Sequence, residues 1–376
     1  MWGRMPRPSR PLSGKGKAKR PSPVEAVARA ALALRRGEAV RVTGADGIVA
    51  TVLAVETASD HALVKLGASK RKPARLVLTH ARAKTLKIRL YTQDVVALPL
   101  EAKVRIAELR AIADPTVDMN APLKGPFTAL REALPDADAV GVKLAKLAGL
   151  LPAVVVVTGR AAKASLAIEA NAIRDYERET VRTLSLVTRA RVPLEGAEDT
   201  ELVAFRAGDA SPEHYAIVIG HPPRNKPVLA RLHSECFTGD LLSSLRCDCG
   251  SQLRGAIEAI SKAGGGVLLY MAQEGRGIGL INKLRAYRLQ DQGFDTLEAN
   301  TRLGFQVDER LYGIAARMFE LLGFKSVKLM TNNPDKVAAL KAAGIKVSSR
   351  VPHKFPSNVH NREYLAAKKA KAGHFL

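Results

Sequence analysis

Hydrophobic residues in the first half of the chain follow helical spacing in some segments and form strand-like runs in others. Val24, Val27, Ala28 and Ala31 recur at the three- and four-residue intervals of a helix that buries one face. Short apolar runs interrupted by glycine predict strands. We therefore expect helices at 24–36, 139–151 and 164–175, and strands at 38–52, 61–78 and 153–157.

The second half alternates strand-like and helix-like segments more regularly. Glycines at 264–266 and 293 follow two apolar periodic segments, as is usual at helix C-termini. The pattern predicts strands at 227–232, 267–271, 327–330 and 345–348, and helices at 253–262, 280–292, 309–322 and 334–343. This alternation is typical of the α/β class.

The length of 376 residues is too great for one typical core and predicts two domains. The polar segment 194–200 is the expected boundary. We therefore expect one α/β domain at 23–194 and a second at 195–376. Residues 1–22 are rich in Pro, Gly, Ser and cations, and we expect them to form a disordered basic tail.

The formal net charge is +23, and most of the excess of Lys and Arg lies before residue 195. Such an excess favours an anionic partner, whether a nucleotide, a nucleic acid or an acidic surface. The basic segment 71–89 lacks the interleaved aromatic residues of single-strand binders, so we do not expect a nucleic-acid partner. The longest apolar run, near 147–157, is interrupted by Pro152 and is too short to span a bilayer. We expect a cytoplasmic protein.

All three cysteines, Cys236, Cys247 and Cys249, lie close together in the sequence. An odd number of clustered thiols in an intracellular enzyme indicates a metal site rather than disulfides. A zinc ion with three protein ligands keeps a fourth position for water, and zinc lowers the pKa of that water to about 7. Two alternatives stay open: a closed site with His233 as the fourth ligand, and three buried cysteines without a metal.

The cysteines belong to a long segment that resembles a known family. Residues 231–253 have the sequence RLHSECFTGDLLSSLRCDCGSQL, residues 266–310 have GVLLYMAQEGRGIGLINKLRAYRLQDQGFDTLEANTRLGFQVDER, and residues 330–340 have MTNNPDKVAAL. This sequence closely resembles GTP cyclohydrolase II, from about residue 227 to the C-terminal HNREYLAAKKAKAGH.

The resemblance implies a fold, a reaction and cofactors. The fold is a mixed sheet with flanking helices, in a homodimer. The reaction converts GTP to 2,5-diamino-6-ribosylamino-4(3H)-pyrimidinone 5′-phosphate, formate and pyrophosphate, the first committed step of riboflavin synthesis. The catalytic zinc is held by Cys236, Cys247 and Cys249, and Mg²⁺ binds the GTP phosphates.

Several residues suit a nucleotide phosphate on their own chemistry. The glycines of Glu274-Gly275-Arg276-Gly277-Ile278-Gly279 allow backbone amides to approach a phosphate at a helix start, although a flexible turn is the alternative. Asn333 and Pro334 fit an N-cap and a first helical position. Lys336 is disfavoured by the dipole of that first turn unless a phosphate offsets it. The resemblance assigns GTP contacts to Arg231, Leu232, His233, Ser234, Glu235, Gln252, Glu274, Gly275, Arg276, Thr296, Thr331 and Lys336.

Asp308 and Arg310 have two interpretations. Asp308 suits an N-cap of the predicted helix 309–322, which requires no catalytic role. The resemblance implies instead that Asp308 accepts a proton and that Arg310 attacks the α-phosphate, which gives a guanidine–phosphate intermediate and expels pyrophosphate. Because arginine is normally a cation that clamps phosphate, a clamp stays open for Arg310. Tyr287 matches a tyrosine implicated in catalysis.

Residues 24–192 weakly resemble 3,4-dihydroxy-2-butanone 4-phosphate synthase, in ALRRGEAVRV and VKLAKLAGLLPAVVVV. That family needs an acidic cluster after its first strand, whereas TGADGIVATVLAVE carries only Asp46 and Glu56. We therefore expect a degenerate, inactive domain. The role of this N-terminal domain stays open. It could form a dimer contact, bind a partner or tune the second domain. The alternatives for the whole chain are a bifunctional riboflavin enzyme and a non-enzymatic, zinc-stabilised nucleic-acid binder.

Overall fold

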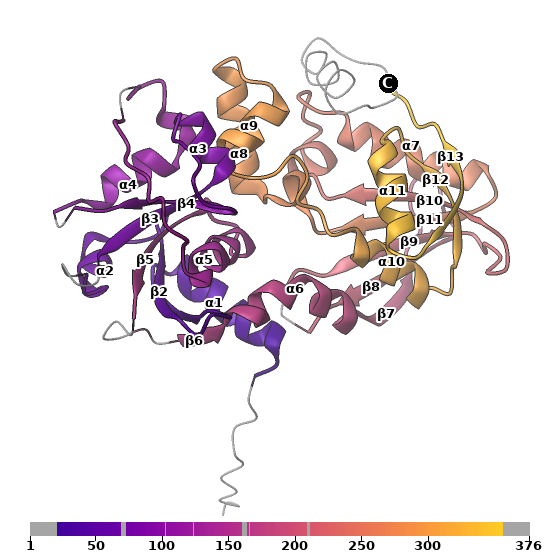
Figure 1. Cartoon of the computed structure of the whole chain (residues 1–376). Coiled ribbons are helices and arrows are strands. Elements are labelled where there is room, and N and C mark those ends of the chain that lie inside the picture. Colours follow the sequence, from indigo (N-terminus) through magenta and orange to yellow (C-terminus); the bar gives the residue numbers. More distant parts are fainter. Residues whose placement is uncertain are drawn as a thin grey trace, which may run out of the picture.

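The structure is a computed structural model that describes residues 21–68, 73–101, 103–122, 124–159, 164, 166–208 and 211–355 (Figure 1). Most of the predicted basic tail and the C-terminal HNREYLAAKKAKAGH lie outside these residues. Ser22, expected in the tail, accepts a hydrogen bond from the amide of Glu25 and caps helix α1 (Pro23–Arg35). The predicted helix 24–36 is thus confirmed.

The N-terminal half is built on a six-stranded sheet in the order β4-β3-β5-β2-β1-β6. All its neighbouring strands are antiparallel except β1 and β6. Its strands are β1 (Val40–Thr43), β2 (Val49–Ala54), β3 (Ala74–Thr79), β4 (Val95–Pro99), β5 (Ala153–Thr158) and β6 (Leu166–Glu169).

The two faces of this sheet are covered by different helices. Alternate residues of β5 point to opposite faces, so Val154 and Val156 pack with α1, α5 (Asp136–Leu147) and α6 (Ala170–Thr183). Val155 and Val157 pack on the other face with α3 (His80–Thr85) and α4 (Ile106–Ala113). That second core also includes residues of α8 (Leu280–Asp291) and α9 (Thr296–Arg302), which belong to the second half.

The second half is built on a mixed seven-stranded sheet in the order β13-β12-β10-β11-β9-β8-β7. The central strands β10, β11 and β12 run parallel, whereas β7, β8, β9 and β11 are antiparallel neighbours. The strands are β7 (Ser185–Arg191), β8 (Thr200–Arg206), β9 (His214–Ile219), β10 (Val228–Ser234), β11 (Gly266–Met271), β12 (Ser326–Met330) and β13 (Lys346–Val351).

Helices flank both faces of this second sheet. Helices α10 (Tyr312–Leu321) and α11 (Pro334–Ala342) bury one face, and α7 (Cys249–Lys262) covers the other. The central strand β11 is almost wholly hydrophobic and buried, whereas the edge strands β7 and β13 are mostly exposed and carry polar residues. The expected α/β class, with a mixed C-terminal sheet and flanking helices, is confirmed.

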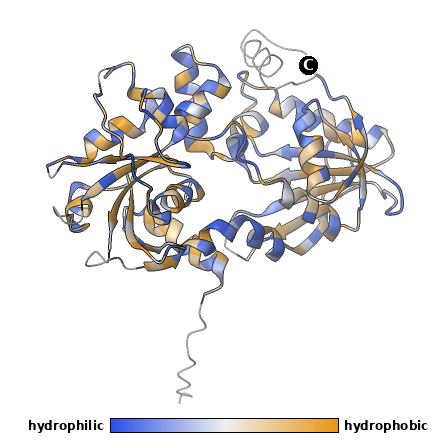
Figure 2. Ribbon diagram, viewed as in Figure 1, coloured by the Kyte–Doolittle hydropathy of each residue, from blue (hydrophilic) through white to orange (hydrophobic). Residues whose placement is uncertain are grey.

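The linking helix α6 is mostly hydrophilic and buries only Ala170, Ile173 and Thr180 (Figure 2). It leads directly into β7, which pairs with β8 at the edge of the second sheet. The second sheet therefore begins before the linker at 194–200, where Leu194 and Ala197 form an isolated bridge. The division into 23–194 and 195–376 stays a prediction.

Two predicted elements of the N-terminal half are wrong. The strand expected at 61–78 begins instead as helix α2 (Asp60–Lys65), because the Ser59 hydroxyl accepts a hydrogen bond from the amide of Ala62 and caps it. Only its end is the strand β3. The helix expected at 164–175 is preceded by β6, which extends the sheet beside β1, and α6 begins at Ala170.

Within the described residues, no helix is both long enough and apolar enough to cross a membrane.

Candidate functional site

A cavity lies at the carboxyl ends of the parallel strands β10, β11 and β12, where ligands commonly bind in α/β sheets. Residues after each strand enter its wall, together with α8 and the first turns of α7 and α11. Every residue that the resemblance assigns to the metal, to GTP or to catalysis lines this cavity except Asp308, which contacts the lining residue Arg310. The structure thus brings the predicted site residues together, although their individual roles stay predictions.

The three cysteine sulfurs converge at one end of the cavity. The ligand atoms of Cys236, Cys247 and Cys249 lie within 4.8 Å of one another, and the Sγ atoms of Cys236 and Cys247 are 3.7 Å apart. Two sulfurs each about 2.3 Å from a tetrahedral zinc ion lie about 3.8 Å apart, so the measured separation fits a shared metal.

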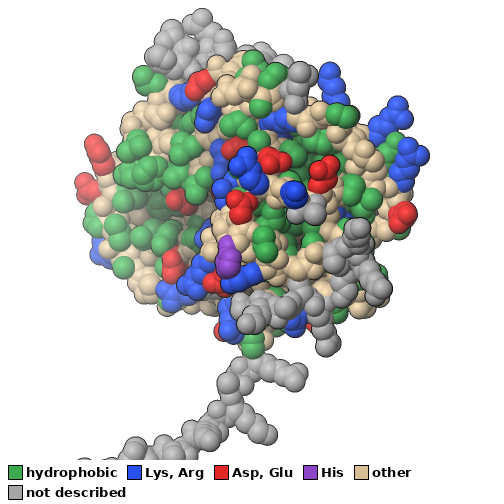
Figure 3. Space-filling view, turned by 90° about the vertical axis from the view of Figure 1, so that its left-hand side faces the viewer, with side chains coloured by type: hydrophobic (Ala, Val, Ile, Leu, Met, Phe, Trp, Pro, Cys, Tyr) green, Lys and Arg blue, Asp and Glu red, His purple; other side chains and the backbone are tan. Residues whose placement is uncertain are grey.

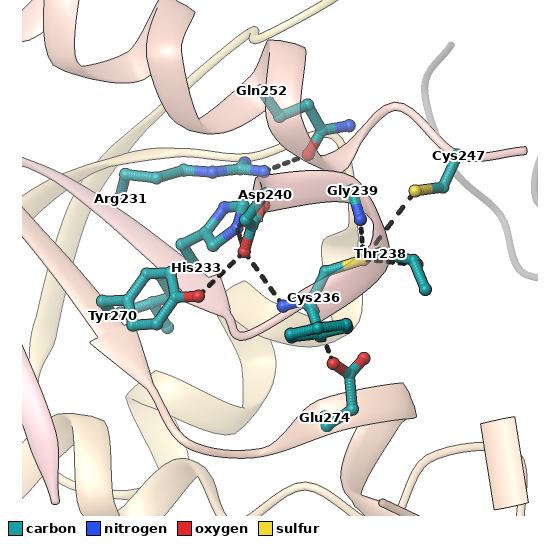
Figure 4. Close-up of polar contacts among 12 residues, drawn as sticks. Arg231, His233, Cys236, Thr238, Gly239, Asp240, Cys247, Gln252, Tyr270 and Glu274 are labelled. Atoms are coloured by element: carbon teal, nitrogen blue, oxygen red, sulfur yellow. Dashed lines mark hydrogen bonds and ion pairs between the residues drawn. The ribbon is translucent and has the colours of Figure 1, made fainter. Parts of the chain in front are cut away.

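The surroundings of Cys236 stabilise a thiolate (Figure 4). The Gly239 amide donates to its Sγ at 3.4 Å, and the Lys283 ammonium lies 3.0 Å from it. Hydrogen bonds from Cys247 and Cys249, followed by that of Lys283, lower the pKa of Cys236 below its usual range. The hydrogen bonds to Cys236 in turn raise the pKa values of Cys247 and Cys249. Thiolate is the form that binds zinc.

Gly239 leaves room for the sulfurs. A Cβ atom at this position would lie 2.7 Å from the Sγ of Cys247 and 3.0 Å from that of Cys236. No side chain larger than hydrogen fits there without moving these sulfurs.

His233 is held by a carboxylate. Its Nε2 lies 3.0 Å from both carboxylate oxygens of Asp240, which also accepts hydrogen bonds from the Tyr270 hydroxyl and the Cys236 amide (Figure 4). Among the described residues, the group placed to share a metal contains the three cysteines and not His233. The closed site with His233 as fourth ligand is therefore not the arrangement seen.

Buried polar atoms in the cavity have no hydrogen-bond partner among the described residues. They are Nε of Arg231, Oγ of Ser234 and a terminal nitrogen of Arg276. Burial lowers the pKa of Arg231 to about 10, so it stays a cation at neutral pH, and it also donates to the Met330 carbonyl and to Gln252. Buried donors without partners are costly, and a polar anionic ligand would satisfy these.

Asp308 and Arg310 form a bidentate ion pair. The Nε and a terminal nitrogen of Arg310 lie 2.8 and 2.5 Å from the two carboxylate oxygens. Burial opposes the charge of Asp308, but the hydrogen bonds and charge of Arg310 outweigh it and lower the pKa of this carboxyl. The Tyr312 hydroxyl also donates to Asp308 at 3.1 Å.

The first interpretation of Asp308, as a helix N-cap, is not the arrangement seen. Helix α10 begins only at Tyr312, and Leu311 is its N-cap. The Asp308 carboxylate instead accepts from the amide and guanidinium of Arg310, and the Glu309 amide donates to the carbonyl of Arg276. The segment 305–311 is therefore a loop that packs on the glycine-rich turn η3 (Glu274–Gly277).

The junction between β12 and α11 follows the predicted capping. The Asn333 side chain accepts from the Asp335 amide at 2.9 Å, and Pro334 begins the helix. The buried Lys336 donates to the carbonyl of Leu232 at 3.0 Å. A phosphate is thus not needed to explain this cation, although Lys336 does line the cavity.

Tyr287 points its hydroxyl toward the thiol end, 3.4 Å from the hydroxyl of Thr238. Burial raises its pKa to about 12, so at neutral pH the hydroxyl is protonated and can donate a hydrogen bond. Lys283, one turn earlier on the same face of α8, contacts Thr238 and Glu274 at 2.9 Å. Although burial opposes its charge, hydrogen bonds to Cys236 and Glu274 raise the pKa of Lys283.

Sequence reasoning missed Lys283, Asp240 and Gly239. Each acts through partners that come together only in the fold, and none has a distinctive local motif. The four-residue spacing of Lys283 and Tyr287 was the one available indication that both share a helix face.

Comparison with known proteins adds an independent finding. A model of the family "GTP cyclohydrolase II" matches residues 185–352. A protein named GTP cyclohydrolase-2 from Azospirillum brasilense is 50% identical over 363 residues, which cover 94% of this chain and 94% of that protein. Another of that name, from Azotobacter vinelandii, is 60% identical over 164 residues, 44% of this chain and 79% of its own length.

A solved two-domain 3,4-dihydroxy-2-butanone 4-phosphate synthase from A. baumannii overlaps with a TM-score of 0.33 at 17% identity, over 86% of this chain and 99% of that one. An overlap this low carries no argument, so the resemblance of residues 24–192 to that synthase stays a prediction.

Proposed function

The chain belongs to the GTP cyclohydrolase II family, and from this premise we propose that the cavity beside Cys236 converts GTP to 2,5-diamino-6-ribosylamino-4(3H)-pyrimidinone 5′-phosphate, formate and pyrophosphate. This reaction begins riboflavin synthesis. The observation that carries the proposal is the convergence, in one cavity, of three thiols and several buried cations.

Zinc is the proposed metal, one ion per chain, bound by Cys236, Cys247 and Cys249. The sulfur spacing, the lowered pKa of Cys236 and the close fit of Gly239 support this assignment. When bound, zinc would supply a water molecule activated for hydrolysis of the guanine ring. The Lys283 ammonium and the Gly239 amide hold the Cys236 sulfur in orientation, as outer contacts of metal ligands commonly do.

The substrate assignment rests on the polar atoms that line the cavity. The atoms without partners on Arg231, Ser234 and Arg276 are the proposed direct contacts of GTP. Mg²⁺ on the phosphates would neutralise part of their charge. The remaining proposed GTP contacts are Leu232, His233, Glu235, Gln252, Glu274, Gly275, Thr296, Thr331 and Lys336.

Arg310 is the proposed contact of the α-phosphate. In a nucleophilic role, its guanidinium transfers a proton to Asp308, a nitrogen–phosphorus bond forms, and the bond to pyrophosphate breaks. Water then attacks the phosphorus and breaks the nitrogen–phosphorus bond, which frees the 5′-phosphate and returns a proton to the guanidine. The lowered pKa of Asp308 keeps the carboxylate ionised at neutral pH, and the bidentate pair orients Arg310. A clamping arginine would use the same orientation without the covalent bond, and mass spectrometry of protein quenched during turnover separates the two.

Tyr287 is the third proposed catalytic residue. Its protonated hydroxyl lies at the thiol end of the cavity, where it is placed to hydrogen-bond the reacting ring or the leaving formyl group.

The decisive test is to incubate the protein with GTP, Zn²⁺ and Mg²⁺ and to measure formate and pyrophosphate together. Equal amounts of the two are expected. Formate without pyrophosphate would show ring opening with another outcome, and the absence of both would contradict the proposal.

The structure gives less support to the nucleic-acid alternative. Of the basic segment 71–89, Arg75 pairs with buried Asp138 and Arg82 with Asp118, so neither is free for a phosphate backbone; Arg71 and Lys72 lie outside the described residues. On the face shown in Figure 3, Lys and Arg are interspersed with acidic and hydrophobic side chains rather than forming one basic surface. The homodimer and the cytoplasmic location implied by the resemblance stay part of the proposal.

A further inference from the structure

The N-terminal half contacts the second half at two elements that line the proposed active site. One is α8, whose two faces serve different purposes. Lys283 and Tyr287 face the cavity, whereas Leu289 is buried in the core of the first sheet. The N-terminal half therefore supports the back of the helix that carries two site residues.

Polar contacts fix α8 to the same surface. The Arg285 guanidinium binds both carboxylate oxygens of Glu56, at 3.1 and 2.8 Å, and the Asn282 amide donates to the carbonyl of Gly149 at 3.1 Å. Glu56, one of the isolated acidic residues of the N-terminal sequence, thus contacts the other half of the chain.

The second contact reaches the segment that carries Asp308 and Arg310. The Lys146 ammonium, on α5, lies 2.6 Å from the Glu309 carboxylate, and about a fifth of each side chain is exposed. The same Glu309 oxygen accepts from the Gln306 amide at 2.8 Å. Glu309 lies between Asp308 and Arg310 in the sequence. The ion pair with Lys146 therefore fixes the catalytic loop at the position between the two proposed catalytic residues.

The loop is also closely packed against the glycine-rich turn. The Glu309 amide donates to the Arg276 carbonyl at 3.0 Å, and a Cβ at Gly277 would lie 2.7 Å from the Glu309 backbone. A shift of Glu309 would therefore move Arg310 relative to Arg276, a proposed GTP contact. Small displacements of catalytic groups reduce rates strongly.

We infer that Lys146 is a positioning residue for the Asp308–Arg310 pair, through which the N-terminal half holds the catalytic loop of the other half in place. This inference rests on the proposed function. A partly exposed ion pair adds little stability, so the effect of Lys146 should appear in the rate of reaction rather than in folding.

The test compares Lys146→Met with Lys143→Met in the full-length chain. Lys143 lies one turn earlier on α5 and lines the same space between the halves, but it pairs with Glu177 of its own half at 3.5 Å. We expect Lys146→Met to lower kcat for formate release about tenfold or more, with KM for GTP changed less than about twofold. Lys143→Met should keep both values near those of the wild type, and Lys146→Arg should restore most of kcat.

Glu309→Gln removes the charge of the other member of the ion pair. It therefore tests the role of this pair even if Lys146→Met fails to fold. It should show a similar loss of kcat, and the double variant should lose no more than either single variant, because both remove one interaction. A kcat within about twofold of wild type for both single variants would overturn the inference alone. A wild-type protein that releases no formate would overturn the proposed function and this inference together.

Discussion

Gly239 shows how one residue determines the thiol site. Its amide donates to the Cys236 sulfur, and its missing side chain leaves the space into which Cys247 and Cys236 project. The sequence identified the three thiols because cysteine has few roles in such a cluster. It did not identify Gly239, because the close approach arises from the turn around η2 (Phe237–Leu241) and not from the spacing of the cysteines.

At this position we predict that Gly239→Ala weakens zinc binding by about tenfold to a hundredfold, since forcing a methyl group into such a packed site costs about 1–3 kcal/mol. Zinc affinity is measured by competition with a chelator. Gly208→Ala is the control, because a Cβ there meets only ordinary contacts with Thr183. Unchanged affinity in Gly239→Ala would show that the thiols do not share a metal in this arrangement.

Lys283 and Asp240 illustrate the same limit at the residue scale. Lys283 meets Cys236 across 47 positions in the sequence, and Asp240 meets Tyr270 across 30. Neither pairing leaves a local pattern. Residues whose function depends on such partners are found only once the chain is folded.

At the scale of elements, segments with clear boundaries or short buried runs were predictable and edge elements were not. Helices α8 and α11 and strands β11 and β12 were expected close to their observed bounds, because a glycine or proline marks one end of each helix and the two strands are short runs of largely buried residues. Strands β7, β8 and β9 were not predicted. Six of the seven residues of β7 are exposed, so it lacks the alternation that marks a strand.

The segment after β13 carries a prediction about pH. The His353 Nε2 lies 2.9 Å from the Gln252 carbonyl, and the His353 amide donates to Asn332 at 3.0 Å. These contacts fasten the end of β13 to α7 and to the loop after β12. Burial lowers the pKa of His353 to about 4.

Because an unfolded histidine titrates near 6.5, the unfolded state binds more protons between about pH 6.5 and 4. The contribution of His353 to the free energy of unfolding is therefore complete above pH 6.5 and is lost as the pH falls toward 4. In urea denaturation, the free energy of unfolding of the wild type should exceed that of His353→Gln by more at pH 7.5 than at pH 5. A difference in the free energy of unfolding that grows as the pH falls would contradict a lowered pKa of His353 in the folded protein.

At the scale of the whole molecule, the two halves share a hydrophobic core. Leu289 and Phe305 of the second half are buried with Leu76 and Val155 of the first. The contact between Glu56 and Arg285 spans 229 positions, and no sequence pattern indicated that these residues meet. The sequence therefore predicted two α/β units and left tuning of the second as one possible role of the first, but it did not indicate the contacts through which the first half supports the proposed active site.

The relative from Azotobacter vinelandii is much shorter than this chain, since the 164 matched residues cover 79% of its length. A protein of that name thus exists at little more than half the length of this chain. In this chain, residues of α8 and α9 are buried in a core to which the N-terminal half contributes most of the residues.

A shared core predicts cooperative unfolding. Leu289→Ala should lower the free energy of unfolding by about 2–5 kcal/mol, because the side chain is fully buried, and calorimetry should show one transition that shifts as a whole. Leu284→Ala, on the half-exposed face of the same helix, is the matched control with little effect. Two separate transitions, of which only one shifts, would show that the halves fold independently.

The central claim is that three thiolates hold a catalytic zinc beside bound GTP, and Cys247→Ser tests it most directly when metal content and formate release are measured on the same samples. We predict about one zinc ion per wild-type chain, with zinc and formate release lost together in the variant. Active wild-type protein without zinc, or a variant that releases formate at the wild-type rate, would contradict the account.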